Sequence, residues 1–361
     1  MSDAVIAFLG DLYLGQSPER KTIGQGLREL LRKADYVVAN LEAPLTCQVE
    51  SPVTDKIALR SAPQAGKVLR DWGIDAVTLA NNHMFDQGRK GFEDTREALL
   101  AEGIAFFGAG ENLAEAGRGH VVAIHGLRVG LLACSWASAQ TTCATNSSFG
   151  CAPLDESWLL PATTDLAKKV DALVVVPHWG YCDCAYPLPE HVDLAGRLLD
   201  AGATAVVGHH SHVIQGMVRS GNSLVAYSLG NFIWENIAHR GRMLRQTRDN
   251  REGLVITVRL GERRVVDYQA VPVLIDDDGV DMDPRPRRLR RLERRSRPLA
   301  RASYPRYWRR VMCRRFARRL LYWINPFQWR HINRNTLDGA WLMLKSFFRK
   351  TPKSYCGEDR E

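Results

Sequence analysis

The chain has 361 residues, of which 45% are hydrophobic and 25% are charged, as in ordinary globular proteins. This composition excludes low-complexity, collagen-like and disulfide-scaffold proteins. A chain of this length can bury a large apolar core as one domain or two, so any bound metal is expected to serve function. No stretch reaches the roughly 18 to 20 uninterrupted apolar residues that a membrane-spanning helix needs.

The N-terminus and the cysteines indicate a cytoplasmic protein. Residues 1–3 lead directly into the apolar run 4–9, without the basic segment and cleavage site of a signal peptide. The eight cysteines show no framework spacing. We therefore expect free thiols rather than disulfides.

The net charge of +9 combines two parts of opposite sign. Residues 1–283 carry 26 basic and 35 acidic side chains, whereas residues 284–361 carry 23 and 5. The C-terminal part is therefore expected to be a separate unit. The predicted divisions are an α/β domain over 1–275, an acidic and then arginine-rich linker over 276–298, and a basic amphipathic helical tail over 299–361.

Short β-rich apolar runs alternate with segments of helical period up to about residue 275, a pattern typical of α/β folds. Strands are predicted at residues 4–9, 36–39, 76–80, 128–134, 172–177, 204–207, 224–228 and 253–260. Helices are predicted at residues 22–33, 64–72, 90–102 and 190–201. Ligands of open α/β sheets bind beyond the carboxyl ends of the strands, so the polar residues that follow these runs are the first candidates for a site.

Carboxylates, amides and imidazoles follow most of the predicted strands. In chain order these clusters are Gly10-Asp11, Asn40-Leu41-Glu42, Asn81-Asn82-His83, His178-Trp179-Gly180, His209-His210-Ser211-His212 and Gly230-Asn231. This mixture of oxygen and imidazole nitrogen donors suits ions of the Mn, Fe, Zn or Mg class.

Each cluster also has a plainer interpretation. Asp11 can belong to a turn, residues 81–82 can cap the following helix, and His178 can be a core histidine with a hydrogen-bond partner. Residues 209–212 point more strongly to metal, because three imidazoles are costly to bury without partners. The ordered set is more specific than any of its members.

The order of the clusters resembles the metallo-dependent phosphoesterase superfamily and, more closely, the CapA capsule-synthesis family of poly-gamma-glutamate biosynthesis proteins. The matching stretches are residues 10–15, 40–46, 79–88, 178–180, 200–213 and 227–232. The resemblance covers about residues 3–275 and implies a sandwich of two mixed sheets flanked by helices. It also implies one or two divalent ions (Mn, Fe, Zn or Mg) held by Asp11, Glu42, Asn82, His178, His210 and His212.

The resemblance implies further roles around these ligands. His83 is expected over the substrate as a general acid or phosphate-orienting group, with Asp86 orienting its ring. Supporting positions around the ligands or the substrate are assigned to Asn40, Asn81, His209, Asn231 and Cys182. Tyr13 stands where the superfamily has a histidine, and Cys182 stands where the capsule family commonly has a glutamate. Cys182 can join a metal as a thiolate or be a packed free cysteine.

Two segments of the tail place apolar side chains at helical spacing among basic ones. The first segment carries Trp308, Met312, Phe316, Leu320 and Trp323, and the second carries Leu337, Trp341, Leu344 and Phe348. We expect such helices to lie on an anionic membrane surface. Docking on the catalytic domain or on another subunit is the alternative, and nucleic-acid binding is the least expected.

The sequence therefore predicts a metal-dependent hydrolase of the phosphoesterase fold. Its expected substrate is phosphorylated or polymer-linked, and its expected place is the cytoplasmic face of the membrane, in contact with a polymer-synthesis complex. The alternative is a non-catalytic accessory protein of capsule or exopolymer synthesis and export.

Overall fold

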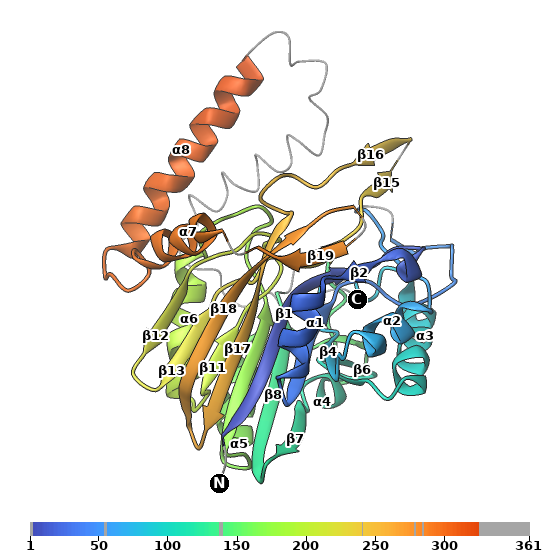
Figure 1. Cartoon of the computed structure of the whole chain (residues 1–361), viewed down its shortest axis with the longest axis horizontal. Helices are drawn as coiled ribbons and strands as arrows, with labels where there is room; N and C mark the ends of the chain where they lie inside the picture. The colour runs from blue at the N-terminus through green and yellow to red at the C-terminus, as the bar shows by residue number, and fades with distance from the viewer. Residues whose placement is uncertain are drawn as a thin grey trace.

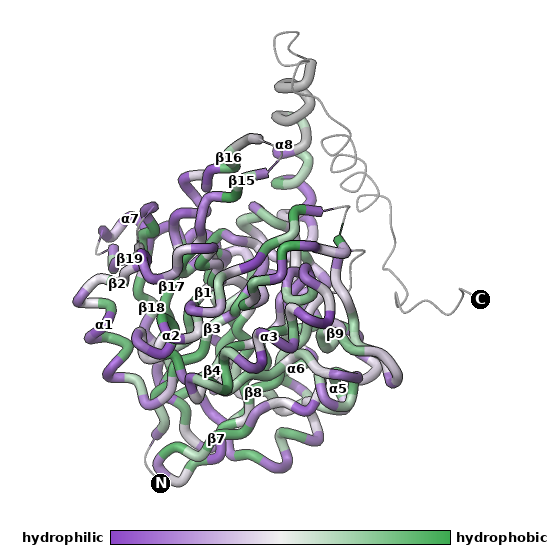
Figure 2. The backbone as a smooth tube through the Cα atoms, turned by 90° about the vertical axis from the view of Figure 1, so that its right-hand side faces the viewer, coloured by the Kyte–Doolittle hydropathy of each residue, from purple (hydrophilic) through white to green (hydrophobic). Residues whose placement is uncertain are grey.

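Two β-sheets pack face to face at the centre of the structure, and helices cover their outer faces (Figure 1). This computed structural model describes residues 3–324 apart from residues 54–55, 137–139, 240, 278 and 284. Figure 2 shows that hydrophobic residues gather along the central strands, as expected for a sandwich whose core lies between layers.

The larger sheet contains both parallel and antiparallel pairs. Its strands are β1 (Ala4–Tyr13), β2 (Thr22–Ile23), β3 (Tyr36–Leu41), β4 (Ala76–Thr78), β5 (Ala105–Phe107), β14 (Asn231–Trp234), β17 (Glu252–Gly261), β18 (Arg264–Ile275) and β19 (Gly279–Met282). Their order is β2-β19-β18-β17-β1-β3-β4-β5, and β14 also pairs with β1. Strands β1, β3, β4 and β5 are parallel neighbours, whereas β17 runs antiparallel to both β1 and β18.

The smaller sheet has a parallel centre and antiparallel edges. Its strands are β7 (His120–Ile124), β8 (Leu127–Ser135), β10 (Ala172–His178), β11 (Ala205–Val207), β12 (Met217–Ser220) and β13 (Ser223–Ala226), in the order β12-β13-β11-β10-β8-β7. Two short ribbons are separate from both sheets and pair β6 (Ala109–Gly110) with β9 (Gly150–Cys151) and β15 (Ile237–His239) with β16 (Arg242–Leu244).

Helices cover the outer face of each sheet. The larger sheet packs against α1 (Gln25–Arg32), α2 (Ala65–Asp71) and α3 (Gly88–Ala101). The smaller sheet packs against α5 (Glu156–Ala167) and α6 (Pro189–Asp200). The short helix α4 (Leu113–Ala116) and the 3-10 helix η1 (Pro18–Arg20) lie in connections.

The alternation of side chains along β1 explains the layering. Ile6 and Phe8 point between the sheets, where they share a cluster with Val174 of the smaller sheet. Ala7 and Leu9 point to the opposite face and share a cluster with the helices α1, α2 and α3. A strand buried on both faces reads as a continuous apolar run, which is the pattern seen at residues 4–9.

All eight predicted strands and all four predicted helices are present, with ends shifted by a few residues. The predicted helix 22–33 begins at Gln25, because Thr22–Ile23 forms an edge strand instead. The prediction missed β18, whose outward positions are polar, and α5, whose interior holds Pro161. The fold class, an α/β sandwich of two mixed sheets flanked by helices, is confirmed.

The range predicted as a linker, 276–298, contains regular structure. Gly279–Met282 forms β19, and α7 (Pro286–Ser296) docks on the sandwich. Arg288 of α7 is buried and forms ion pairs with the buried carboxylates of Asp283 and Glu252. The arginine-rich composition predicts a linker because composition does not reveal which acidic partners the fold supplies.

The first predicted tail helix is confirmed as α8 (Tyr304–Ile324), which projects from the body of the molecule in Figure 1. Trp308 and Met312 are buried in the cluster that contains α6, so this part of the apolar face docks on the sandwich. The second predicted tail segment lies outside the described residues. Within the described part of the chain, no helix is long and apolar enough to cross a membrane.

Candidate metal centre

The predicted ligands come together where the carboxyl ends of strands from both sheets meet. The larger sheet contributes Asp11 in β1, Glu42 just after β3 and Asn82 in the loop after β4. The smaller sheet contributes His178 at the end of β10 and the histidines of the loop after β11, His210 and His212. The sandwich therefore brings oxygen and nitrogen donors together from opposite sides.

Gly10 allows Asp11 to reach this position. A Cβ atom on Gly10 would lie 2.1 Å from the carbonyl oxygen of Gly230, so a larger residue would push β14 away from β1. The amide of Asp11 donates to that same carbonyl at 3.0 Å. The close approach places Asn231 beside Asp11. Oδ1 of Asn231 then lies 2.9 Å from Nδ1 of His212.

Three groups of metal-binding side chains overlap in the site. In each group the ligand atoms lie within 4.8 Å of one another. The inner group consists of Glu42, His178 and His210. The carboxylate group consists of Asp11, Glu42 and His212. The outer group consists of Cys182, His210 and His212. Glu42 belongs to the first two groups and therefore lies between them.

Distances in the inner group fit a bound cation. Nε2 of His178 lies 2.8 Å from Oδ1 of Asn82, 3.0 Å from Nδ1 of His210 and 3.3 Å from Oε1 of Glu42. A single imidazole nitrogen cannot donate to three atoms at once. Ligand atoms around one divalent cation are about 3 Å apart, so the spacing of these side chains is compatible with their holding one ion.

Glu42 also fits a metal ligand by what it lacks. Its side chain is fully buried, and Oε1 has no hydrogen-bond partner among the described residues. Such an oxygen costs about 1–3 kcal/mol when nothing compensates it. Nε2 of His212 approaches it at 3.6 Å. The buried oxygen and the surrounding imidazoles form a donor set that fits a divalent cation.

Asn40 orients three of the ligands from behind. Its amide nitrogen lies 2.8 Å from Oδ1 of Asp11, 3.2 Å from Oε2 of Glu42 and 3.3 Å from Nδ1 of His178. Its own oxygen accepts from the amide of Asn81 at 3.1 Å. These contacts leave Nε2 of His178 and Oε1 of Glu42 facing the centre, as supporting residues do in metal sites.

The histidine loop after β11 holds an uncommon backbone conformation. His210 and His212 have φ angles of 89° and 54°, in the left-handed region that favours glycine. Such conformations cost about 1–3 kcal/mol each and concentrate at functional sites. His209 is buried between them and β1, and its Nε2 donates to the carbonyl of Leu9 at 3.0 Å. His209 therefore supports the loop rather than joining a donor group.

Burial and neighbouring charges shift the titration of the ligands. Burial raises the pKa of Glu42 well above its ordinary value, and burial together with the other imidazoles lowers the pKa of His178. For His212, burial lowers the pKa, but the charge of Glu42 and the hydrogen bond to Asp11 outweigh it and raise the pKa. For Asp11, burial raises the pKa, but the hydrogen bond from His212 and the nearby imidazoles outweigh it and lower the pKa. A cation in the site would favour the ionised carboxylates and neutral imidazoles that metal binding requires.

His83 and Asp86 form a pair beside the donor groups. Nδ1 of His83 lies 2.6 Å from Oδ2 of the fully buried Asp86. The same carboxylate accepts from the amide of Leu59 at 2.7 Å and pairs with Nζ of Lys56 at 2.6 Å. Burial lowers the pKa of His83, and the charge of Asp86 partly opposes this. The carboxylate of Asp86 thus contacts the ring at Nδ1, and its expected role in orienting His83 stays a prediction.

Sequence reasoning missed two polar residues at the site, Lys56 and Asn250. Lys56 binds Asp86 and donates to the carbonyl of Asn82, but a single lysine in a long loop carries no signal. Asn250 donates to Oδ1 of Asp183 at 2.8 Å and to the carbonyl of His212 at 3.2 Å, and its position depends on the fold alone.

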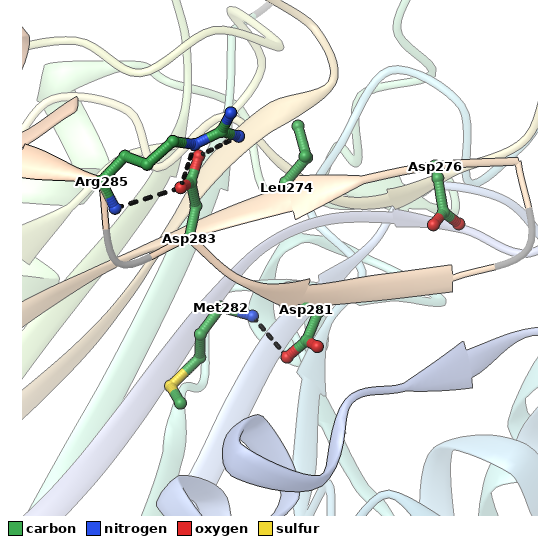
Figure 3. A pocket seen from close by; sticks show the side chains of 6 residues that line it. All are labelled: Leu274, Asp276, Asp281, Met282, Asp283 and Arg285. Atoms are coloured by element: carbon green, nitrogen blue, oxygen red, sulfur yellow. Dashed lines mark hydrogen bonds and ion pairs between the residues drawn. The ribbon is translucent and has the colours of Figure 1, made fainter. Parts of the chain in front are cut away.

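A separate pocket lies at the β18–β19 edge (Figure 3) and is lined by Leu274, Asp276, Asp281, Met282, Asp283 and Arg285. None of the donor residues lines it. Two of its lining residues, Arg285 and Asp283, form an ion pair with Nε 2.6 Å from Oδ1. We therefore place the candidate chemistry at the strand ends and not in this pocket.

The two-sheet sandwich thus gathers its donor groups at the strand ends. The family model "Bacterial capsule synthesis protein PGA_cap" matches residues 5–236, and the chain belongs to this family. It is 31% identical over 245 residues to the PGA biosynthesis protein CapA of Bacillus subtilis, covering 65% of this chain and 64% of that protein. It is 32% identical over 212 residues to the capsule biosynthesis protein CapA of Bacillus anthracis, covering 57% and 52%.

These matches thus span less than two thirds of either relative's length. Among solved structures, the 5'-nucleotidase precursor from Thermus thermophilus is similar at a TM-score of 0.47 and 15% identity, over 75% of this chain and 54% of that one.

Proposed function

We propose that the chain is a metal-dependent hydrolase of capsule polymer synthesis that acts on a phosphorylated or polymer-linked substrate. The observation that carries this proposal is the position of Oε1 of Glu42. This buried oxygen has no hydrogen-bond partner among the described residues, faces Nε2 of His178 and of His212 at 3.3 and 3.6 Å, and lies between two overlapping donor groups. When bound, one or two divalent cations (Mn, Fe, Zn or Mg) would polarise an ester oxygen and activate a water molecule.

The chain's own residues have distinct tasks in this proposal. Asn82, His178 and His210 hold one side of the centre, Asp11 and His212 hold the other, and Glu42 serves both. Asn40 and Asn231 fix the ligands that they contact.

His83 would serve the substrate rather than the metal. Its Nδ1 is engaged by Asp86. Nε2 is therefore the atom available to exchange a proton with a leaving group or to hold a phosphoryl oxygen, a contribution of typically about 10²–10⁴-fold.

The test of this proposal is hydrolysis of model phosphate monoesters and diesters by metal-reconstituted protein. We compare the wild type with Glu42→Gln and with Glu19→Gln, an exposed control that makes the same chemical change. Metal-dependent hydrolysis that Glu42→Gln abolishes and Glu19→Gln retains would support the proposal. Hydrolysis that survives Glu42→Gln would contradict it, as would a metal-loaded wild type that cleaves none of these esters.

One feature favours a second candidate, a non-catalytic accessory protein of polymer synthesis or export. Tyr13 stands two residues after Asp11, and its ring packs on Trp234 at 5.5 Å, so no imidazole supplements the carboxylate there. A producing strain that carries Glu42→Gln distinguishes the two candidates. Unchanged polymer yield with a metal-free protein would support the accessory role.

We also propose that the basic C-terminal part contacts an anionic membrane surface at the cytoplasmic face. Trp308 and Met312 are buried, so the contact falls to exposed arginines of α8 such as Arg309 and Arg310. The full chain should sediment with phosphatidylserine vesicles and not with neutral ones. The double variant Arg309→Glu, Arg310→Glu should weaken this binding, whereas the control Arg32→Glu on the distant α1 should not.

A further inference from the structure

The outer group contains a thiol that faces two imidazoles. Sγ of Cys182 lies 3.8 Å from Nε2 of His210, and both atoms lie within 4.8 Å of a ligand nitrogen of His212. Cys182 is exposed, whereas the two histidines are half-buried. The outer group therefore forms the solvent side of the donor cluster.

Contacts on two sides hold this thiol in place. The amide of Asp183 donates to the carbonyl of Ser211 at 2.8 Å, which ties the cysteine loop to the histidine loop. On the other side, Arg315 of α8 donates to the carbonyl of Asp183. Asp183 itself has a φ of 57°, a left-handed conformation that these contacts sustain.

Helix α8 also packs on the residues that follow the thiol. Sγ of Cys184 lies 3.8 Å from Sδ of Met312, and the hydroxyl of Tyr304 donates to the carbonyl of Pro187 at 2.7 Å. The loop is thus fixed by the docked part of the tail, and the position of Cys182 depends on that docking.

The spacing in the outer group suits a tetrahedral ion. Zinc bonds of about 2.3 Å to sulfur and 2.0 Å to nitrogen at a tetrahedral angle separate the two ligand atoms by about 3.5 Å. Sγ of Cys182 and Nε2 of His210 are 3.8 Å apart, so a small side-chain rotation would bring them to this distance. His210 and His212 also belong to the inner and carboxylate groups, respectively, so a thiolate at Cys182 would add a sulfur ligand on the solvent side of the same centre.

Ordinary packing does not explain this cysteine. Cys134, Cys151 and Cys184 are buried, as structural cysteines usually are. Cys182 is exposed and contacts His210, and it shares a donor group with His210 and His212, each of which also groups with Glu42. Its surroundings are those of a ligand.

We propose that Cys182 is a thiolate ligand of the metal centre and that with His210 and His212 it makes the centre favour zinc over magnesium. The assignment rests on the proposed metal-dependent function. On binding, the sulfur–metal bond forms and the thiol proton leaves to solvent. Thiolates select softer ions, whereas magnesium prefers an all-oxygen set, so this residue would set the metal preference of the chain.

Cobalt(II) provides a direct test, because a thiolate ligand gives it a charge-transfer absorption band that nitrogen and oxygen ligands do not give. We load metal-free wild type, Cys182→Ser and Cys47→Ser with cobalt and measure bound cobalt and absorption on the same samples. Cys47 is an exposed free thiol outside the site and serves as the control. The band should appear in the wild type and in Cys47→Ser and disappear in Cys182→Ser while cobalt remains bound.

Competition between zinc and magnesium provides the second readout. Cys182→Ser should lower the preference for zinc by at least about tenfold, since even residues behind the ligands change metal affinity by 10- to 100-fold. Cobalt bound to the wild type without the band would overturn the assignment of Cys182 and leave the metal-dependent function standing. A wild type that binds no cobalt would overturn both.

Discussion

Glu42→Gln should change the stability of the metal-free protein and its stabilisation by metal in opposite directions. In the metal-free protein, Oε1 of Glu42 is buried without a partner, and burial raises the pKa of its carboxyl. A group whose pKa is higher in the folded state loses its stabilising contribution as the pH rises from its unfolded pKa through its folded pKa. The metal-free wild type should therefore lose stability over that interval.

The size of the effect follows from the contacts of this oxygen. A glutamine amide in its place can donate to Nε2 of His178 or of His212, which lie 3.3 and 3.6 Å away. Relieving one unsatisfied buried acceptor is worth about 1–3 kcal/mol. We expect Glu42→Gln to raise the free energy of unfolding of the metal-free protein by this amount near neutral pH.

Metal should reverse the order of the two proteins. At 100 times its dissociation constant, a cation stabilises the wild type by about 2.7 kcal/mol, whereas Glu42→Gln lacks the ligand that two donor groups share. The assay is urea unfolding of chelator-treated protein with and without added zinc or manganese. The exposed Glu19→Gln should behave as wild type. Equal stabilisation of wild type and Glu42→Gln by metal would refute this reasoning, as would a less stable metal-free Glu42→Gln.

Further predictions concern α7 and the histidine beside the metal centre. Arg288→Ala removes the buried partner that Asp283 and Glu252 share, and these carboxylates then keep only the more exposed Arg285 and Arg291. The substitution should cost about 1–3 kcal/mol in urea unfolding. The exposed Arg290→Ala should change stability by less than about 0.5 kcal/mol, and equal effects would show that the pairs do not hold α7. Hydrogen bonds from Arg285 and Arg288 lower the pKa of Asp283. Its contribution to the free energy of unfolding is therefore present above its unfolded pKa and should be lost as acid titration passes its folded pKa. An Asp283→Asn protein with the same acid-unfolding midpoint as wild type would count against this. His83→Asn should lower the turnover of a cleaved ester about 10²–10⁴-fold with bound metal unchanged, and a loss of metal instead would make His83 a ligand.

The sequence predicted the strands whose apolar runs are continuous, because a strand buried on both faces leaves that pattern whatever its neighbours are. It missed β18 because its outward side is polar. It also took residues 276–298 as a linker, since charge alone does not show that the fold supplies Glu252 and Asp283 as partners of Arg288.

The candidate site divides in the same way. Asp11, Glu42 and His178 were found because each carries a carboxylate or an imidazole just beyond an apolar run predicted as a strand, where ligands of α/β sheets bind. Lys56 and Asn250 were not found, since their contacts with Asp86 and Asp183 arise between segments far apart in the chain. The sequence pattern predicts which side chains are candidate ligands, and only the tertiary structure shows which residues contact and position them.

The central claim is that these strand ends form a metal centre, and metal content tests it most directly. Untagged wild type and a His210→Ala, His212→Ala double variant are reconstituted with manganese, iron or zinc and measured by elemental analysis. Because both histidines belong to the overlapping donor groups, we predict one or two bound ions in the wild type and loss of them in the variant. A wild type that binds no metal after reconstitution, or a variant with the same metal content, would contradict the account.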